Sequence, residues 1–191
     1  MPYRATVLLE GHAYRMPSQV LSDELSRPRG RTGGLHTLLL RYAQALMTQI
    51  AQTAVCNQHH SMEKRLCRWL LSCLDRSSSN DLTVTQQTIA VALGVRREGV
   101  TEAAGRLQRA GFICYHRGHI RVLDRAGLEK QACECYQVVK TEFDRLLPDA
   151  TATQAAPPRC MPADQAPSSD RMRVSASRSS SQLRVLSRRC G

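Results

Sequence analysis

Apolar residues recur at helical spacing on both sides of a glycine within residues 85–111. The apolar positions are Ile89, Ala90 and Leu93 before the glycine, and Val100, Ala103 and Leu107 after it. Thr85 stands where its hydroxyl can accept a hydrogen bond from the first turn of a helix. Gly94 can adopt the left-handed conformation that ends a helix. The pattern predicts two short helices that meet at a tight corner.

Residues 113–123 change to an alternation of apolar and polar positions, which predicts a β-hairpin. Ile113 and Tyr115 alternate before the turn, Ile120 and Val122 alternate after it, and Gly118 provides the turn itself. A helical corner alone could be an ordinary pair of helices with a solvated charged face. A corner followed directly by a basic-tipped hairpin is instead typical of a winged helix-turn-helix. The fold class is therefore expected to be mostly α with a small β wing.

A long helix is expected before this region, over residues 35–58. Its apolar residues follow alternating steps of four and three, the spacing of a coiled-coil seam. They are Leu39, Ala43, Leu46, Ile50 and Thr53. This stripe fits either a core helix or a dimerisation helix. Because little of the chain precedes the stripe to cover it, dimerisation is the favoured interpretation.

The remaining patterns divide the chain into four segments. Residues 1–34 hold a possible strand at 3–9, a short helix at 18–25 and a basic, glycine-rich break. Residues 35–60 form the dimerisation helix, and residues 61–148 form the winged helix-turn-helix domain. That domain would include a helix at 62–75, a short strand at 82–84 and one last helix from Asp124 to near Pro148.

Residues 149–191 are rich in Ala, Pro, Ser and Arg and hold few apolar residues. They are expected to be a disordered basic tail, since they cannot bury enough apolar surface to fold alone. Such a tail could bind DNA electrostatically or be an extension without function. The second interpretation is slightly favoured.

The chain of 191 residues carries a formal net charge of +11. Residues 96–121 hold six arginines against two glutamates, so the positive charge is concentrated at the helix-turn-helix. This balance indicates a polyanionic partner. The sequence shows neither the apolar core of a signal peptide nor a run of about 20 apolar residues, so a cytoplasmic protein without a membrane partner is expected.

The eight cysteines contain no CxxC pair. Cys133 and Cys135 are the nearest approach, but on one continuous helix their side chains would diverge, which is poor geometry for one metal ion. Adjacent His59 and His60 diverge for the same reason and are better explained as cations at a helix end. No metal and no cofactor are therefore expected. The sequence also contains no catalytic serine–histidine–aspartate set, carboxylate pair or nucleotide-binding loop, so an enzyme is not expected.

Several stretches between Leu35 and Leu147 resemble the Crp/Fnr family of bacterial transcription regulators. They are RYAQALMTQIAQ, EKRLCRWLL, LTVTQQTIAVALGVRREGVTEAAGRLQRAGFI and YHRGHIRVLDRAGLEKQACECY. The resemblance implies a homodimer that binds double-stranded DNA, with RNA polymerase a further candidate partner. Family members carry a β-roll sensor before the dimerisation helix, and here GHAYRMPSQVLSDEL resembles only its closing segment. A truncated member or an incomplete sequence is therefore expected.

The expected function is sequence-specific DNA binding, with residues 85–110 in the major groove and the wing, residues 113–123, on the phosphate backbone. The expected DNA-binding residues are Thr85, Gln86, Arg96, Arg97, Glu98, Thr101, Glu102, Arg106, His116, Arg117 and His119. The resemblance implies that Arg97 and Glu98 reach base edges. Glu102 departs from the family, where a second arginine is common. The alternative is a truncated interaction protein that does not bind DNA and heterodimerises with full-length relatives.

Overall fold

The computed structural model describes residues 7, 11–26, 33–77, 79–148 and 170–174. The chain divides into two compact units, one of residues 1–37 and 158–191 and the other of residues 38–157. Within the described residues, no helix combines the length and the apolar character needed to cross a bilayer.

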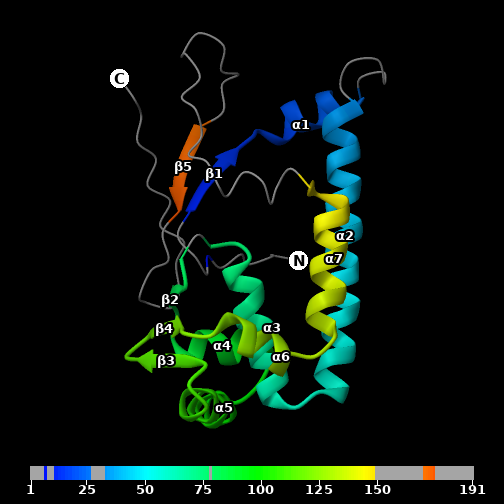
Figure 1. Cartoon of the computed structure of the whole chain (residues 1–191). Coiled ribbons are helices and arrows are strands. Elements are labelled where there is room, and N and C mark those ends of the chain that lie inside the picture. Colours follow the sequence, from blue (N-terminus) through cyan, green and yellow to red (C-terminus); the bar gives the residue numbers. More distant parts are fainter. Residues whose placement is uncertain (1–6, 8–10, 27–32, 78, 149–169, 175–191) are drawn as a thin grey trace. The chain divides into compact units, whose positions relative to one another are not determined.

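In the first unit, strand β1 (Gly11–Arg15) pairs antiparallel with strand β5 (Asp170–Val174), and helix α1 (Ser18–Ser26) follows β1. The two strands are drawn in blue and orange in Figure 1. The short helix was predicted, whereas β5 was not, because the alternation in DRMRV is too brief to stand out in a polar segment. Most of the strand expected at residues 3–9 lies outside the described residues, as does the rest of the segment 149–191.

Helix α2 (Gly33–His59) confirms the long helix expected at residues 35–58 and extends it at both ends. Much of its apolar surface is exposed in the part of the chain that the structure describes. The exposed large apolar side chains are Leu38, Leu39, Leu40, Tyr42, Met47, Ile50 and Val55. Ala45 and Cys56 are fully buried, so the helix is attached to its own unit mainly along one side.

Helix α3 (Met62–Leu74) lies at the centre of the second unit and packs on four other helices. Ser61 is the N-cap of the helix, because its hydroxyl accepts a hydrogen bond from the Lys64 amide. The core side chains that α3 contributes are Leu66, Cys67, Leu70, Leu71, Cys73 and Leu74. Trp69, the only tryptophan of the chain, is half-buried.

The helix-turn-helix forms as the sequence predicts, from α4 (Gln86–Leu93) and α5 (Arg97–Arg109). The Thr85 hydroxyl accepts from the Thr88 amide at 3.1 Å. Gly94 has a φ of 64°, the left-handed conformation that ends α4. Arg65 of α3 donates a 2.6 Å hydrogen bond to the Leu93 carbonyl oxygen, which secures the corner against the central helix.

The wing is a three-stranded antiparallel sheet in the order β2-β4-β3, made of β2 (Asp81–Thr83), β3 (Ile113–His116) and β4 (His119–Val122). Ile113 pairs with Val122, and Ile120 pairs with both Leu82 and Tyr115. Arg117 and Gly118 form the two-residue turn, with φ values of 39° and 84°. Positive φ at both positions is typical of the type I′ turn that suits the twist of a hairpin.

The single last helix expected from Asp124 to near Pro148 is wrong, because the chain breaks it into α6 (Arg125–Gln131) and α7 (Cys135–Leu146). Ala132 leaves the helical conformation with a ψ of 156°. The break allows both short helices to pack on α3, which one straight helix could not do. Asp124 caps α6 as expected, accepting a 2.8 Å hydrogen bond from the Gly127 amide.

Gly127 is required by close packing beneath this cap. A Cβ at this position would lie 2.5 Å from Cε1 of Phe112 and would also collide with the Asp124 carboxylate. We therefore expect Gly127→Ala to lower the free energy of unfolding by about 1–3 kcal/mol. Gly99→Ala is the matched control, since nothing lies within 4 Å of its Cβ position in α5. The control should raise stability by about 1 kcal/mol. Urea titration followed by circular dichroism measures both, and equal effects would contradict the packing argument.

The turn of the wing generates a second test of stability. A positive φ suits asparagine and glycine far better than a β-branched residue. Arg117→Asn should therefore retain or raise the stability of the protein, whereas Arg117→Val should lower it by about 1–2 kcal/mol. Thermal unfolding of the two variants measures the difference. A valine variant as stable as the asparagine variant would show that the turn does not hold this conformation in solution.

Candidate nucleic-acid interface

The second helix of the helix-turn-helix separates a buried face from an exposed one. Its buried residues are Val100, Ala103, Ala104 and Leu107, which confirms the apolar face expected from the sequence. The expected DNA-binding residues Arg97, Glu98, Thr101 and Glu102 are all exposed on the other side. The helical period thus leaves long and hydrogen-bonding side chains free at the start of α5.

Two arginines stand at the beginning of α5 without a charged partner among the described residues. Arg96 occupies the N-cap position, where its side chain makes no capping hydrogen bond. Arg97 is the first residue of the helix. No carboxylate in the described part of the chain forms an ion pair with either arginine. Both guanidinium groups are therefore available to an anionic partner.

The structure brings two of the expected DNA-binding residues together across the helical corner. The Thr101 hydroxyl donates a 2.8 Å hydrogen bond to Oε1 of Gln86, at the start of α4. The same hydroxyl lies 3.0 Å from the Arg97 carbonyl oxygen. This contact fixes the start of α4 against the exposed side of α5, so the two helices present one continuous polar surface.

Arg106 differs from the other candidate arginines because two carboxylates surround it. Its guanidinium forms an ion pair with Glu63 of α3, and Nη1 lies 3.8 Å from the Glu102 carboxylate. The side chain remains 46% exposed. The charge that Arg106 offers to DNA is therefore partly compensated within the protein.

The wing turn lies beside the cap of α4. His116, Arg117 and His119 are all exposed. A Cβ at Gly118 would be only 3.7 Å from Cγ2 of Thr85. Nδ1 of His119 is also 3.4 Å from the Thr83 hydroxyl. The wing therefore carries its basic and imidazole side chains next to the start of the helix-turn-helix.

An ion pair that the sequence did not reveal stands at the base of the wing. Nε of Arg121 donates to Oδ1 of Asp81 at 2.6 Å, across the paired strands β4 and β2. This hydrogen bond lowers the pKa of Asp81 and raises that of Arg121. The two residues are 40 positions apart, and only the pairing of β2 with β4 makes them neighbours. The wing is consequently less basic at its base than its sequence indicates.

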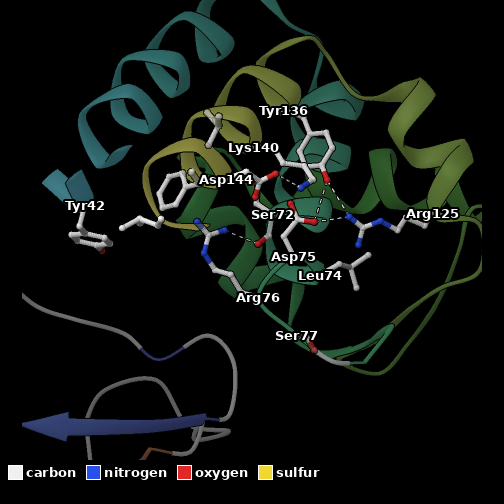
Figure 2. Close-up of a pocket in the computed structure, with 13 residues that line it drawn as sticks. Tyr42, Ser72, Leu74, Asp75, Arg76, Ser77, Arg125, Tyr136, Lys140 and Asp144 are labelled. Atoms are coloured by element: carbon white, nitrogen blue, oxygen red, sulfur yellow. Dashed lines mark hydrogen bonds and ion pairs between the residues drawn. The ribbon is translucent and has the colours of Figure 1, made fainter. Parts of the chain in front are cut away.

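A pocket of about 700 Å³ lies elsewhere in the same unit, between Tyr42 of α2 and residues of α3, α6 and α7 (Figure 2). Nη2 of Arg125 donates to Oδ1 of Asp75 at 2.5 Å, and the Tyr136 hydroxyl donates to the same oxygen at 3.1 Å. Burial opposes the charged form of Arg125, but the hydrogen bonds to Asp75 and Glu129 outweigh it and raise the pKa of Arg125. This network joins three helices, and none of the expected DNA-binding residues lines the pocket.

The helix-turn-helix region is similar in sequence to known proteins. Residues 64–131 match the family model of the Crp-like helix-turn-helix domain. The chain is 29% identical over 133 residues to the transcriptional regulator LdrP of Thermus thermophilus, a match that covers 65% of this chain and 68% of LdrP.

Two solved structures of Crp-family transcriptional regulators from Thermus thermophilus are also similar. One is 28% identical with a TM-score of 0.42, and the match covers 49% of this chain and 49% of the other chain. The other is 25% identical with a TM-score of 0.32, and the match covers 62% of this chain and 56% of the other chain. The chain thus spans about half the length of these solved structures. Residues 64–131 therefore match a Crp-like helix-turn-helix domain, and the chain is similar to transcriptional regulators that carry this domain.

Proposed function

We propose that this chain is a sequence-specific DNA-binding regulator that acts as a homodimer, with α5 in the major groove and the β3–β4 turn on the phosphate backbone. The observation that carries the proposal is the exposed start of α5, where Arg96 and Arg97 have no carboxylate partner among the described residues. The wing turn beside Thr85 supplies a second contact surface at the same side of the corner.

Arg97 is the residue best suited to read a base. It stands in the first turn of α5, where a long side chain can enter the groove. A guanidinium can form a bidentate pair with O6 and N7 of guanine, which discriminates against other bases by about 1–3 kcal/mol. Glu98, also exposed, can accept a hydrogen bond from the amino group of cytosine.

Arg117 is suited to a different task. Arg117 stands in the wing turn with a φ of 39°, and its exposed charge would meet the phosphate backbone if α5 enters the groove. Contacts to phosphate position a protein on the duplex and carry no sequence information directly. The two arginines therefore separate base recognition from backbone attachment.

Dimerisation through α2 is the second part of the proposal. Leu39, Ala43 and Ile50 of the coiled-coil seam are exposed, and Leu46 is half-buried. An exposed apolar stripe of this kind can be buried against the same stripe of a second copy of the chain. A twofold dimer would present two α5 helices to two half-sites of one operator.

Charges placed in the seam should test the dimer. Leu46→Lys together with Ile50→Lys should convert the protein to a monomer, because two desolvated charges in each helix would face each other across the interface. Light scattering at micromolar concentration measures the mass. The matched control is Gln44→Lys, at an exposed position of the same helix outside the seam, which should leave the mass unchanged. A wild-type protein that is already monomeric would contradict this part of the proposal.

Recognition is tested by comparing Arg97→Ala with Arg117→Ala on an operator selected from random duplexes. Arg97→Ala should remove most of the preference for the operator over random DNA, by about 1–3 kcal/mol, with non-specific affinity only modestly reduced. Arg117→Ala should weaken both equally and reduce the log–log salt slope by about 0.9, the value for one lost phosphate contact. Fluorescence anisotropy at several salt concentrations measures the affinity of each variant for the operator and for random DNA, and it also gives the salt slope.

Arg109→Ala provides the control for this comparison, since it removes one charge from the last turn of α5. It should affect operator and random duplex alike. Full preference in Arg97→Ala would move base recognition elsewhere on α5, with Glu98 the next candidate. No duplex binding by the wild type at any salt concentration would favour the interaction protein that pairs with full-length relatives.

A further inference from the structure

Three cysteines and one histidine come together at the junction between α2 and the winged helix. Cys56 lies in the last turn of α2 and His60 directly follows that helix, whereas Cys133 lies in the break between α6 and α7 and Cys135 begins α7. The four potential ligand atoms all lie within 4.8 Å of one another. The three thiols are almost completely buried, and the His60 side chain is only 12% exposed.

The break in the last helix produces this cluster. On one continuous helix the thiols of Cys133 and Cys135 would diverge, and the sequence argument against a metal depended on that geometry. That argument is wrong because Cys133 precedes α7 and Cys135 begins it. The break lets both thiols contact residues at the end of α2, since Cys133 lies beside Cys56 and Cys135 lies beside Gln52.

The distances fit one tetrahedral metal ion. Zinc–sulfur bonds of about 2.3 Å and zinc–nitrogen bonds of about 2.0 Å imply tetrahedral edges of about 3.5–3.8 Å. The Sγ atoms of Cys56 and Cys133 are 3.6 Å apart, and Sγ of Cys135 is 3.4 Å from Nδ1 of His60. These two edges match a single coordination sphere, and all four ligand atoms lie within 4.8 Å of one another.

The neighbouring side chains also suit a metal site. Nε2 of His60 lies 3.2 Å from Oε1 of Glu134, which leaves Nδ1 directed at the cysteines. A carboxylate on the outer nitrogen is the usual means of orienting a metal-binding imidazole. Nε2 of Gln52 donates a 3.2 Å hydrogen bond to Sγ of Cys135, as a donor to a metal-bound thiolate would.

We propose that Cys56, His60, Cys133 and Cys135 bind one structural Zn²⁺ ion. Soft thiolate and imidazole ligands select zinc over magnesium or calcium. Four protein ligands close the tetrahedron, so the ion has a structural role and no open position for a substrate. The ion would join the end of the proposed dimerisation helix to the α6–α7 break and so fix the helix relative to the DNA-binding domain.

Metal analysis of the full-length chain, purified after expression with zinc, tests the proposal. The wild type should contain one zinc per chain, and Cys135→Ser and Cys56→Ser should lose most of it. Cys114→Ser is the matched control, because Cys114 is exposed and lies outside the cluster. Zinc content below a stoichiometric amount in the wild type, or equal loss in the control, would overturn the site. So would a Cys56–Cys133 disulfide in protein prepared without oxidant.

Glu134→Gln keeps the proposal testable if the cysteine variants fail to fold. It retains all four ligands and should weaken zinc binding by about 10–100-fold in competition with a chelator. Replacement of zinc by Co²⁺ in the wild type should also give the intense visible absorption of tetrahedral thiolate coordination. An unchanged zinc affinity in Glu134→Gln, or an octahedral cobalt spectrum, would contradict the assigned ligand geometry.

Discussion

The winged helix depends on the burial of one face of α3. Leu66, Leu70 and Leu71 are completely buried, and each leucine that leaves water contributes about 1.5–3 kcal/mol to the stability of the fold. Because α3 packs on α4, α5, α6 and α7, the same side chains hold both the DNA-facing helices and the closing helices. The orientation of α5 is thus set by a core that lies behind it.

This core explains how a small surface can be both polar and rigid. Arg65 extends from α3 to the carbonyl oxygen of Leu93, and Gly94 turns the chain immediately afterwards. Thr101 and Gln86 then join α4 and α5 on the exposed side. The first turn of α5 is therefore held by contacts on both sides of the corner, which fixes the backbone from which its arginines project. Such preorganisation favours specific recognition over loose electrostatic attachment.

The sequence predicted the elements whose signals are local. The Thr85 cap, the Gly94 corner and the alternation around Gly118 each lie within a few residues, and all three are confirmed. It could not predict contacts that depend on tertiary pairing, such as the ion pairs of Arg121 with Asp81 and of Arg106 with Glu63. These two contacts reduce the charge that the candidate interface offers, although all its predicted residues are at least partly exposed.

The break at Ala132 is a second feature that the local sequence pattern could not predict. Residues 125–146 follow one helical pattern, and no glycine or proline marks the interruption. Packing on α3 overrides that local preference, as tertiary contacts commonly do. On the continuous helix that the sequence predicts, the side chains of Cys133 and Cys135 would diverge. In the fold they lie together with Cys56 and His60.

The central claim is that the start of α5 and the wing turn together form the DNA-binding surface. Nuclear magnetic resonance of the full chain, titrated with a duplex selected from a random library, tests it most directly. The account predicts that the largest amide shifts occur at Arg96–Glu102 and at Arg117–Gly118, with residues of the Asp75–Arg125 pocket unaffected. Large shifts confined to the pocket, or no shifts at saturating duplex, would contradict it.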